Sequence, residues 1–111
     1  MARKLGEGRG APPASAMRLG FTLEAIGDLQ RLRAFISEKN PAAAARIAER
    51  LVTGIDRLTT FPALGRPVDQ APDPERIRDL ILGDYTVRYL LLDSAILVLR
   101  LWHQREDRPE A

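Results

Sequence analysis

Residues 75–103 read ERIRDLILGDYTVRYLLLDSAILVLRLWH, and this stretch decides the fold. It is the part of the chain richest in residues that favour strands, and Gly83-Asp84 and Asp93-Ser94 interrupt it at spacings typical of turns. The pattern predicts three consecutive antiparallel strands. The last two runs are almost wholly apolar, whereas a sheet wetted on one face would alternate. We therefore expect other elements or a partner to cover much of this sheet.

Two amphipathic helices are predicted before these strands. The first covers residues 23–38, and Thr22 is its expected N-cap. Its apolar face consists of Ala25, Leu29, Leu32 and Ile36. The second runs from Pro41 to about Thr60, with Asn40 as its expected N-cap. Because so short a link joins them, the helices should form an antiparallel hairpin.

The second predicted helix carries a narrow apolar stripe. Its members are Ala44, Ile47, Ala48, Leu51, Ile55 and Leu58. We expect the small alanines to let a neighbouring helix approach closely. After this helix, residues 61–67 read FPALGRP, a connector stiffened by prolines. We expect Phe61 and Leu64 to fill the space between helix and sheet.

The predicted fold class is α+β, in the order β-α-α-β-β-β. Residues 18–22 form an N-terminal edge strand, and the αα-hairpin packs on a twisted antiparallel sheet. Residues 17–105 are expected to form one domain. Residues 1–16 are expected to be a disordered N-terminal tail, and residues 106–111 a polar C-terminal tail. Met17 begins a sequence typical of a domain start, so either Met1 or Met17 is compatible with the native start.

Composition excludes several classes of site. The chain has no cysteine and a single histidine, which excludes thiol catalysis, disulfides and multi-histidine metal sites. We expect no cofactor and no metal. The formal net charge of +2 permits nucleic-acid binding without indicating it. No apolar run approaches the roughly 20 residues of a membrane helix, so we expect a cytoplasmic protein.

One basic group is a candidate for chemistry. It comprises Arg78, Arg88, Arg100, His103 and Arg105, with Tyr85 and Tyr89. Arginines on a sheet could hold a phosphodiester and stabilise charge that develops during strand scission. The favoured interpretation is structural, because arginines on a sheet often pair with carboxylates such as Asp79, Asp84 and Asp93 or face water. Whether Arg88 and Arg100 share a face depends on the strand register, because a slip of one residue reverses the answer.

The order of these parts resembles the ParE branch of the ParE/RelE toxin superfamily. The most specific matches are the connector at residues 61–67, the strand YTVRY at 85–89 and the ending LRLWH at 99–103. The resemblance covers roughly residues 17–105. It implies the toxin of a bacterial type II toxin–antitoxin module, neutralised by an antitoxin, a short protein encoded beside it.

Two mechanisms remain open under this resemblance. ParE-like members inhibit DNA gyrase, which implies a toxin that binds its target and is not an enzyme. RelE-like members are ribosome-dependent messenger RNA endonucleases, and here such a nuclease would use Arg78, Arg88, His103 and Arg105. The nucleases use a tyrosine close to the C-terminus, and no tyrosine follows His103, which favours gyrase. A third alternative is a non-toxic module that retains the fold.

The expected partner surfaces follow from the apolar excess and from the basic side chains. We predict that an antitoxin lays an apolar helix beside the hairpin and adds a strand to an open sheet edge. The predicted antitoxin-binding residues are Arg46, Arg50, Arg57, Tyr85, Val87, Tyr89 and Leu91. The predicted target-binding residues are Arg88, Arg100, Trp102 and His103. Direct nucleic-acid binding is expected only under the nuclease interpretation.

Overall fold

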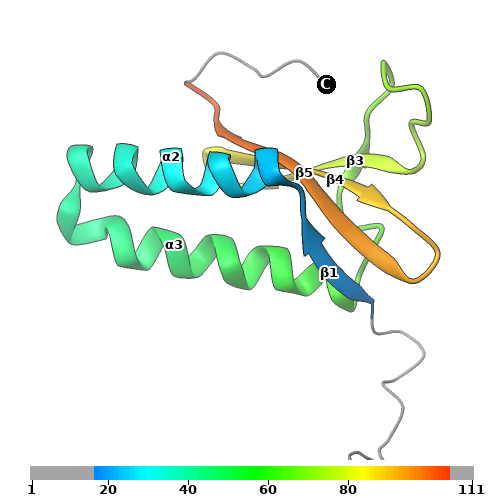
Figure 1. Cartoon of the computed structure of the whole chain (residues 1–111), viewed down its shortest axis with the longest axis horizontal. Helices are drawn as coiled ribbons and strands as arrows, with labels where there is room; N and C mark the ends of the chain where they lie inside the picture. Colours follow the sequence, from blue (N-terminus) through cyan, green and yellow to red (C-terminus); the bar gives the residue numbers. More distant parts are fainter. Residues whose placement is uncertain (1–16, 106–111) are drawn as a thin grey trace, which may run out of the picture.

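The computed structural model describes residues 17–105, in which two helices cover one face of a five-stranded sheet (Figure 1). The elements are β1 (Arg18–Phe21), α2 (Leu23–Lys39), α3 (Pro41–Asp56), the 3₁₀ turn η1 (Arg57–Thr59), β2 (Arg66–Pro67), β3 (Ile77–Leu82), β4 (Tyr85–Leu91) and β5 (Ala95–His103). The predicted α+β class and element order are confirmed. The predictions for residues 1–16 and 106–111 lie outside the described residues.

The sheet has the strand order β1-β5-β4-β3-β2. Strands β3, β4 and β5 form the predicted antiparallel meander. Strand β1 lies at an edge as predicted, but it pairs parallel with β5, so the sheet is mixed. The direction of β1 depends on a strand far along the chain, about which its own short pattern carries no information. The two-residue edge strand β2 was not predicted, because its Arg66-Pro67 sequence has no strand pattern.

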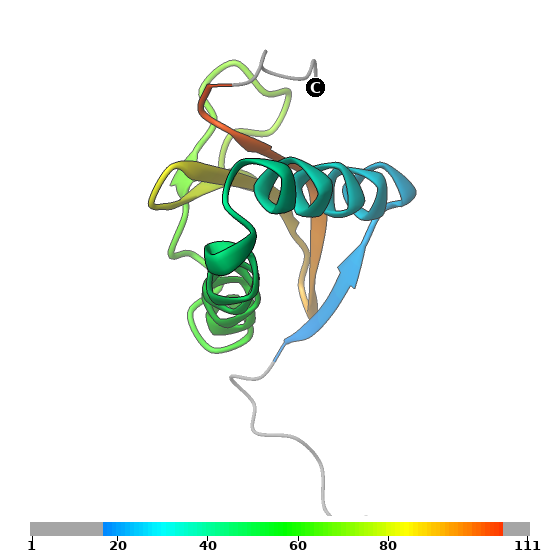
Figure 2. The same ribbon diagram turned by 90° about the vertical axis from the view of Figure 1, so that its left-hand side faces the viewer.

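The predicted helix starts are confirmed by their caps. Ala25 N–H donates to Thr22 Oγ1 at 3.0 Å, and Ala43 N–H donates to Asn40 Oδ1 at 3.2 Å. These bonds satisfy amide groups that the first turn of a helix leaves without a partner. Figure 2 shows the two helices lying side by side, with the twisted sheet behind them.

A β-bulge explains why strand β5 is apolar almost throughout. Arg88 pairs with Arg100, but the next residue, Tyr89, pairs with Val98, so Leu99 is an extra residue. Without this insertion, Val98 and Leu101 would point to opposite faces. With it, both are fully buried in the core beneath the helices. The strand register also shows that Arg88 and Arg100 share a face of the sheet, because they lie directly opposite each other.

Helix α2 completes the edge of β5 beyond the end of β1. Strand β1 pairs only as far as Val98. From there, Thr22 Oγ1 donates to Leu99 O at 2.9 Å, Leu101 N–H donates to Asp28 Oδ2 at 2.9 Å, and Arg31 Nη2 donates to Leu101 O at 3.2 Å. Side chains of α2 and of its N-cap, Thr22, therefore supply the hydrogen bonds that a neighbouring strand would otherwise make.

Asp28 is the centre of this contact and is only 2% exposed. Besides Leu101 N–H, it accepts bonds from Arg100 Nε at 2.8 Å and Arg100 Nη2 at 3.1 Å. Burial alone would raise the pKa of Asp28, but the hydrogen bonds from Arg100, Arg31 and Leu101 together lower it below its ordinary value. The buried carboxylate is thus held in its charged form.

The connector at residues 61–67 is held to the sheet by Tyr89 and Arg78. The Tyr89 hydroxyl donates to Pro62 O at 2.7 Å and accepts from Gly65 N–H at 2.9 Å, while Arg78 Nη1 donates to Gly65 O at 2.9 Å. Because these bonds turn the connector backbone toward the core, its apolar side chains point outward. Phe61 is 55% exposed and Leu64 is 43% exposed, so the prediction that they fill the space between helix and sheet is wrong.

Gly65→Ala should destabilise the fold. The added methyl group would lie 2.7 Å from Tyr89 Cε1 and 2.9 Å from the Asp79 carbonyl oxygen, and backbone cannot easily move away. We expect the free energy of unfolding to fall by about 1–3 kcal/mol in urea titrations. The matched control is Gly27→Ala, where an added methyl group has nothing within 4 Å. The control should gain about 0.5–1 kcal/mol, and an equal loss in both variants would contradict this packing.

Asp28→Asn should lower the free energy of unfolding by about 2 kcal/mol at neutral pH, because Arg100 loses its charged partner. Since the folded-state pKa of Asp28 is lowered, its stabilising effect is fully present above the unfolded value of 3.8. It is lost as the pH falls from 3.8 through the lower folded-state pKa. Chemical unfolding at several pH values should therefore show that the difference in free energy of unfolding between Asp28→Asn and the unmodified chain shrinks below pH 3.8. A difference independent of pH would show that the charge of Asp28 does not stabilise the fold.

Candidate functional site

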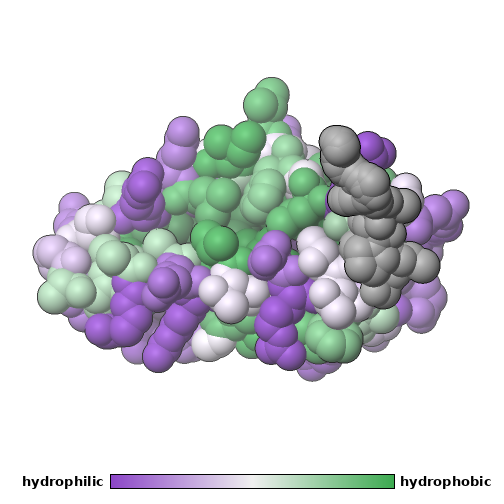
Figure 3. All heavy atoms as spheres, turned by 90° about the horizontal axis from the view of Figure 1, so that it is seen from below, coloured by the Kyte–Doolittle hydropathy of each residue, from purple (hydrophilic) through white to green (hydrophobic). Residues whose placement is uncertain are grey.

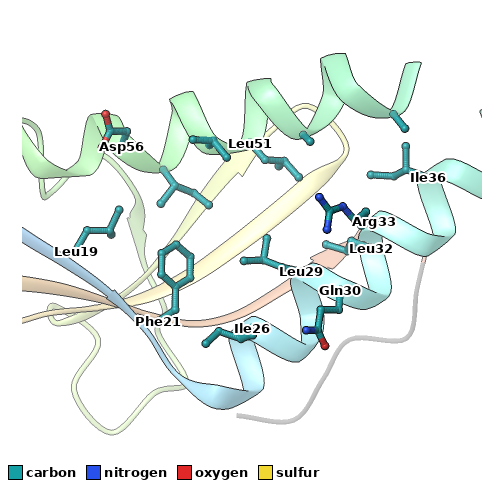
Figure 4. A pocket seen from close by; sticks show the side chains of 14 residues that line it. Leu19, Phe21, Ile26, Leu29, Gln30, Leu32, Arg33, Ile36, Leu51 and Asp56 are labelled. Atoms are coloured by element: carbon teal, nitrogen blue, oxygen red, sulfur yellow. The ribbon is translucent and has the colours of Figure 1, made fainter. Parts of the chain in front are cut away.

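An apolar groove of about 460 Å³ lies between β1, α2 and α3. Strand β1 contributes Leu19 and Phe21, and the apolar side chains of α2 that line it are Ile26, Leu29, Leu32 and Ile36. Helix α3 contributes Ala44, Ala48, Leu51, Val52 and Ile55. Figure 4 shows Phe21, Leu29 and Leu51 pointing from three different elements into one space. The groove therefore belongs to the helical side of the molecule.

Small residues on α3 leave this groove open. Ala44 and Ala48 both line it, and Ala48 is exposed, so its methyl group does not pack against α2. The expectation that these alanines bring a neighbouring helix close does not hold at Ala48. Instead, side chains that end at Cβ leave a volume that no other part of residues 17–105 fills.

Two apolar side chains that line the groove are exposed. Val52 is 66% exposed and Ile26 is 42% exposed. Figure 3 shows apolar side chains gathered over the middle of the lower face, with hydrophilic ones around them. An exposed apolar surface bordered by polar residues is typical of a protein interaction site.

The opposite face of the sheet carries a buried ion pair. Arg88 Nε donates to Asp79 Oδ1 at 2.8 Å, and Arg88 Nη2 donates to Asp79 Oδ2 at 3.0 Å. The guanidinium carbon also lies 5.2 Å from the centre of the Trp102 ring. The bond to Asp79 raises the pKa of Arg88 despite its burial. Arg88 is therefore held as a structural cation between two neighbours, as the carboxylate-pairing interpretation predicted.

A polar hollow of about 440 Å³ lies beside this pair, and it is lined by Arg66, Pro67, Val68, Asp69, Gln70, Asp79 and Arg88. It contains no histidine, serine or cysteine that could act as a nucleophile or proton carrier. Among the residues that the structure describes, no group of three or more His, Cys, Asp or Glu could hold a metal ion. No helix within residues 17–105 is long and apolar enough to cross a membrane.

The four residues predicted for a nuclease are not brought together. Arg78 pairs with Tyr89 across the strands and lies on the helix side, whereas Arg88 points to the opposite face with Asp79. Arg78 Nη2 donates to Glu75 Oε1 at 3.1 Å. His103 lies on the helix side against Phe35, with ring centres 5.7 Å apart. Arg105 is exposed at the end of the described chain.

The predicted target-binding residues are largely covered. Arg88 is 7% exposed, Trp102 is 4% exposed and His103 is 8% exposed. Arg100 is half-buried, and its guanidinium binds Asp28. Direct contact between these side chains and a target does not agree with this burial. The burial of Arg88 could not be expected from the sequence, because Arg usually lies at the surface.

The predicted antitoxin-binding residues divide into two groups. Val87 and Tyr89 are fully buried beneath the helices, so an antitoxin cannot touch them in this structure, and this part of the prediction is wrong. Tyr85 and Leu91 are half-buried and pack against the same core. The exposed residues are Arg46, Arg50 and Arg57.

The groove beside the hairpin was expected, but its lining residues were not identified. Ile26 and Val52 were the available signals, because each is apolar and lies outside the buried stripe of its own helix. Leu19 and Phe21 could not be assigned to the groove from sequence, since their position depends on the parallel pairing of β1 with β5.

Comparisons with known proteins agree on a toxin. The chain is 37% identical over 89 residues to "Toxin RelE1" of Caulobacter vibrioides, covering 78% of this chain and 92% of that protein. It is 32% identical over 84 residues to "Toxin RelE2" of the same organism, covering 75% of this chain and 90% of that protein. It is also 32% identical to "Putative toxin Y4kP" of Sinorhizobium fredii, covering 86% of this chain and 97% of that protein.

Solved structures show the same fold. The structure titled "Chromosomal ParDE TA system from P. aeruginosa" matches with a TM-score of 0.67 and 21% identity, covering 80% of this chain and 97% of that one. The toxin–antitoxin complex RelBE2 from Mycobacterium tuberculosis matches with a TM-score of 0.58 and 20% identity, covering 82% of this chain and 94% of that one. The family described as "ParE toxin of type II toxin-antitoxin system, parDE" matches residues 19–108. The chain therefore belongs to the ParE toxin family of type II toxin–antitoxin systems.

Proposed function

We propose that this toxin stops growth by binding DNA gyrase in the cytoplasm and that it is not itself a nuclease. Gyrase is the target that the resemblance to the ParE branch implies. The observation that carries the proposal against RNA cleavage is the separation of Arg78 and His103 from Arg88 by the thickness of the sheet. A general acid–base site needs its groups within hydrogen-bond reach of one reacting phosphate. Here the candidate groups point to opposite faces.

The alternative function is RelE-like cleavage of messenger RNA on the ribosome. Two relatives that carry the RelE name favour it. For Arg88 to stabilise a phosphate, it would have to exchange its two bonds to Asp79 for bonds to RNA. Releasing a buried arginine from its carboxylate is costly, because Asp79 would then lose its charged partner. This cost favours binding over cleavage.

The cognate antitoxin is the second partner, and we propose the apolar groove as its main docking site. An amphipathic helix in the groove would cover the exposed side chains of Ile26 and Val52. A second contact is available at the outer edge of β3, since β2 pairs there only with Arg78 and Asp79. Backbone groups of residues 80–82 on that edge have no strand neighbour within the described part of the chain. An added strand would bind there by main-chain hydrogen bonds.

Induction of the full chain in cells that lack its antitoxin tests the mechanism. We expect a rise in DNA-damage signals and inhibition of purified gyrase, without fragments of messenger RNA cut at translating codons. Arg105→Ala is the most informative variant, because Arg105 is exposed and its side chain is not needed for the fold. We expect Arg105→Ala to retain growth inhibition within about twofold of the unmodified chain, as is usual for a surface change of small energetic effect.

His103→Ala is the corresponding variant at a buried residue of the predicted nuclease group. Thermal melting must show that this variant still folds. Site-specific cleavage of messenger RNA that is lost in Arg105→Ala would establish the nuclease function instead. If the induced chain neither slows growth nor inhibits gyrase, the non-toxic alternative holds.

A further inference from the structure

The groove ends in two opposite charges. Arg33 of α2 lines it close to Ile36, and Asp56, the last residue of α3, lines it close to Leu19 (Figure 4). Both side chains are exposed. The lining between them is apolar apart from Gln30. The groove therefore has a positive end, an apolar middle and a negative end.

Neither charge is neutralised within residues 17–105. The side chains of Arg33 and Asp56 form no hydrogen bond and no ion pair there. Other arginines in the domain do have carboxylate partners: Arg88 binds Asp79 and Arg100 binds Asp28. The two charges at the groove ends are thus available to a partner at little cost, because they are already hydrated and need not leave another ion pair.

The length of the groove defines the segment that fits. From Ala44 to Asp56, helix α3 advances about 18 Å at 1.5 Å per residue. A bound helix of roughly the same length has about three turns. To cover the groove it needs apolar side chains at positions i, i+3 or i+4, and i+7.

We propose that Arg33 and Asp56 fix the direction and register of the antitoxin helix in this groove. The inference rests on the proposed docking site and adds a specificity determinant to it. The matching helix carries a carboxylate at the end that lies beside Arg33. It carries a Lys or Arg at the end that lies beside Asp56.

Charges are needed for this choice because apolar burial has no preferred direction. A helix could lie in the groove in either orientation with similar apolar contact. In the wrong orientation, its carboxylate would lie beside Asp56 and its cation beside Arg33, so both ends would repel. Charge complementarity at a rim selects among partners more than it adds affinity, and it also rejects antitoxins of related modules with a different charge order.

The arginines of α3 that were predicted to meet an antitoxin lie elsewhere. Successive helical residues are about 100° apart, so Arg46 and Arg50 point away from the stripe that contains Ala44 and Ala48. One helix lying in the groove cannot reach both the stripe and these arginines. Arg46 is therefore a matched control for Arg33, with the same charge and exposure on another face.

The experiment uses the full chain and the antitoxin protein encoded by the adjacent reading frame, with the dissociation constant measured by calorimetry at low salt. We expect Arg33→Glu and Asp56→Lys each to weaken binding by about tenfold, because each reversal places like charges side by side. The matched controls Arg46→Glu and Glu38→Lys, both exposed and outside the groove lining, should stay within about twofold. Ala48→Trp, which fills the groove, should abolish binding.

Rescue separates a direct contact from a general charge effect. Replacing each carboxylate of the antitoxin helix by Lys in turn should restore the affinity of Arg33→Glu at one position only. If Arg33→Glu and Asp56→Lys bind within twofold while Ala48→Trp does not bind, the groove is the docking site but the charges do not orient its occupant. If Arg46→Glu weakens binding more than Arg33→Glu, the antitoxin uses the other face of α3 and the inference is wrong. Failure of the unmodified chain to bind its neighbour's product would instead overturn the proposed docking partner itself.

Discussion

The carboxylate of Asp28 joins the helical layer to the sheet, and the remaining architecture depends on that contact. Strand β1 covers only part of the β5 edge, so the backbone groups of Leu101 would otherwise be left without a partner. Asp28 accepts the Leu101 N–H, and Arg31 donates to the Leu101 carbonyl. The charge of Asp28 is balanced by Arg100, which lies on β5 itself. A buried carboxylate is tolerated here because every one of these bonds favours its charged form.

The contact between Asp28 and β5 also positions α2, which forms one wall of the groove. With α2 held along β5, its apolar residues Leu29 and Ile36 face α3 across a space that Ala44 and Ala48 are too short to fill. On the other side, Gly54 allows α3 to approach Leu82 of β3 closely, since an added Cβ would lie 2.6 Å from Leu82 Cδ2. Helix α3 is thus drawn toward the sheet at its C-terminal end. The same packing that stabilises the toxin leaves an apolar surface exposed, and this surface is the proposed docking site of the antitoxin.

Local patterns were sufficient to predict much of the fold. The caps at Thr22 and Asn40 and the meander over residues 75–103 each depend on residues close together in sequence. Most features that could not be predicted depend on distant partners. The bulge at Leu99 requires knowledge of where Tyr89 pairs, and the outward turn of Phe61 and Leu64 depends on the Tyr89 hydroxyl.

The candidate site, like the fold, could be predicted from the sequence only in part. A groove beside the hairpin could be expected from the two amphipathic helices, but its contact residues could not. Val87 and Tyr89 were assigned to the partner because both faces of β4 are apolar, yet the helices already cover the face on which they lie. Arg88 was a candidate for chemistry, but its guanidinium is bound by Asp79, nine residues earlier on the neighbouring strand. Sequence identified the basic residues and offered carboxylates as partners, and the fold showed which carboxylate each arginine binds.

The most direct test of the account is hydrogen exchange on the full chain, free and bound to its antitoxin. If the antitoxin occupies the groove, amides of β1, α2 and α3 should exchange more slowly in the complex, as should those at the outer edge of β3 near residues 80–82. Amides of β4 should change little, because that strand is already central in the sheet. Slower exchange confined to β4 and β5, with α2 and α3 unchanged, would place the partner on the opposite face of the sheet and contradict the account.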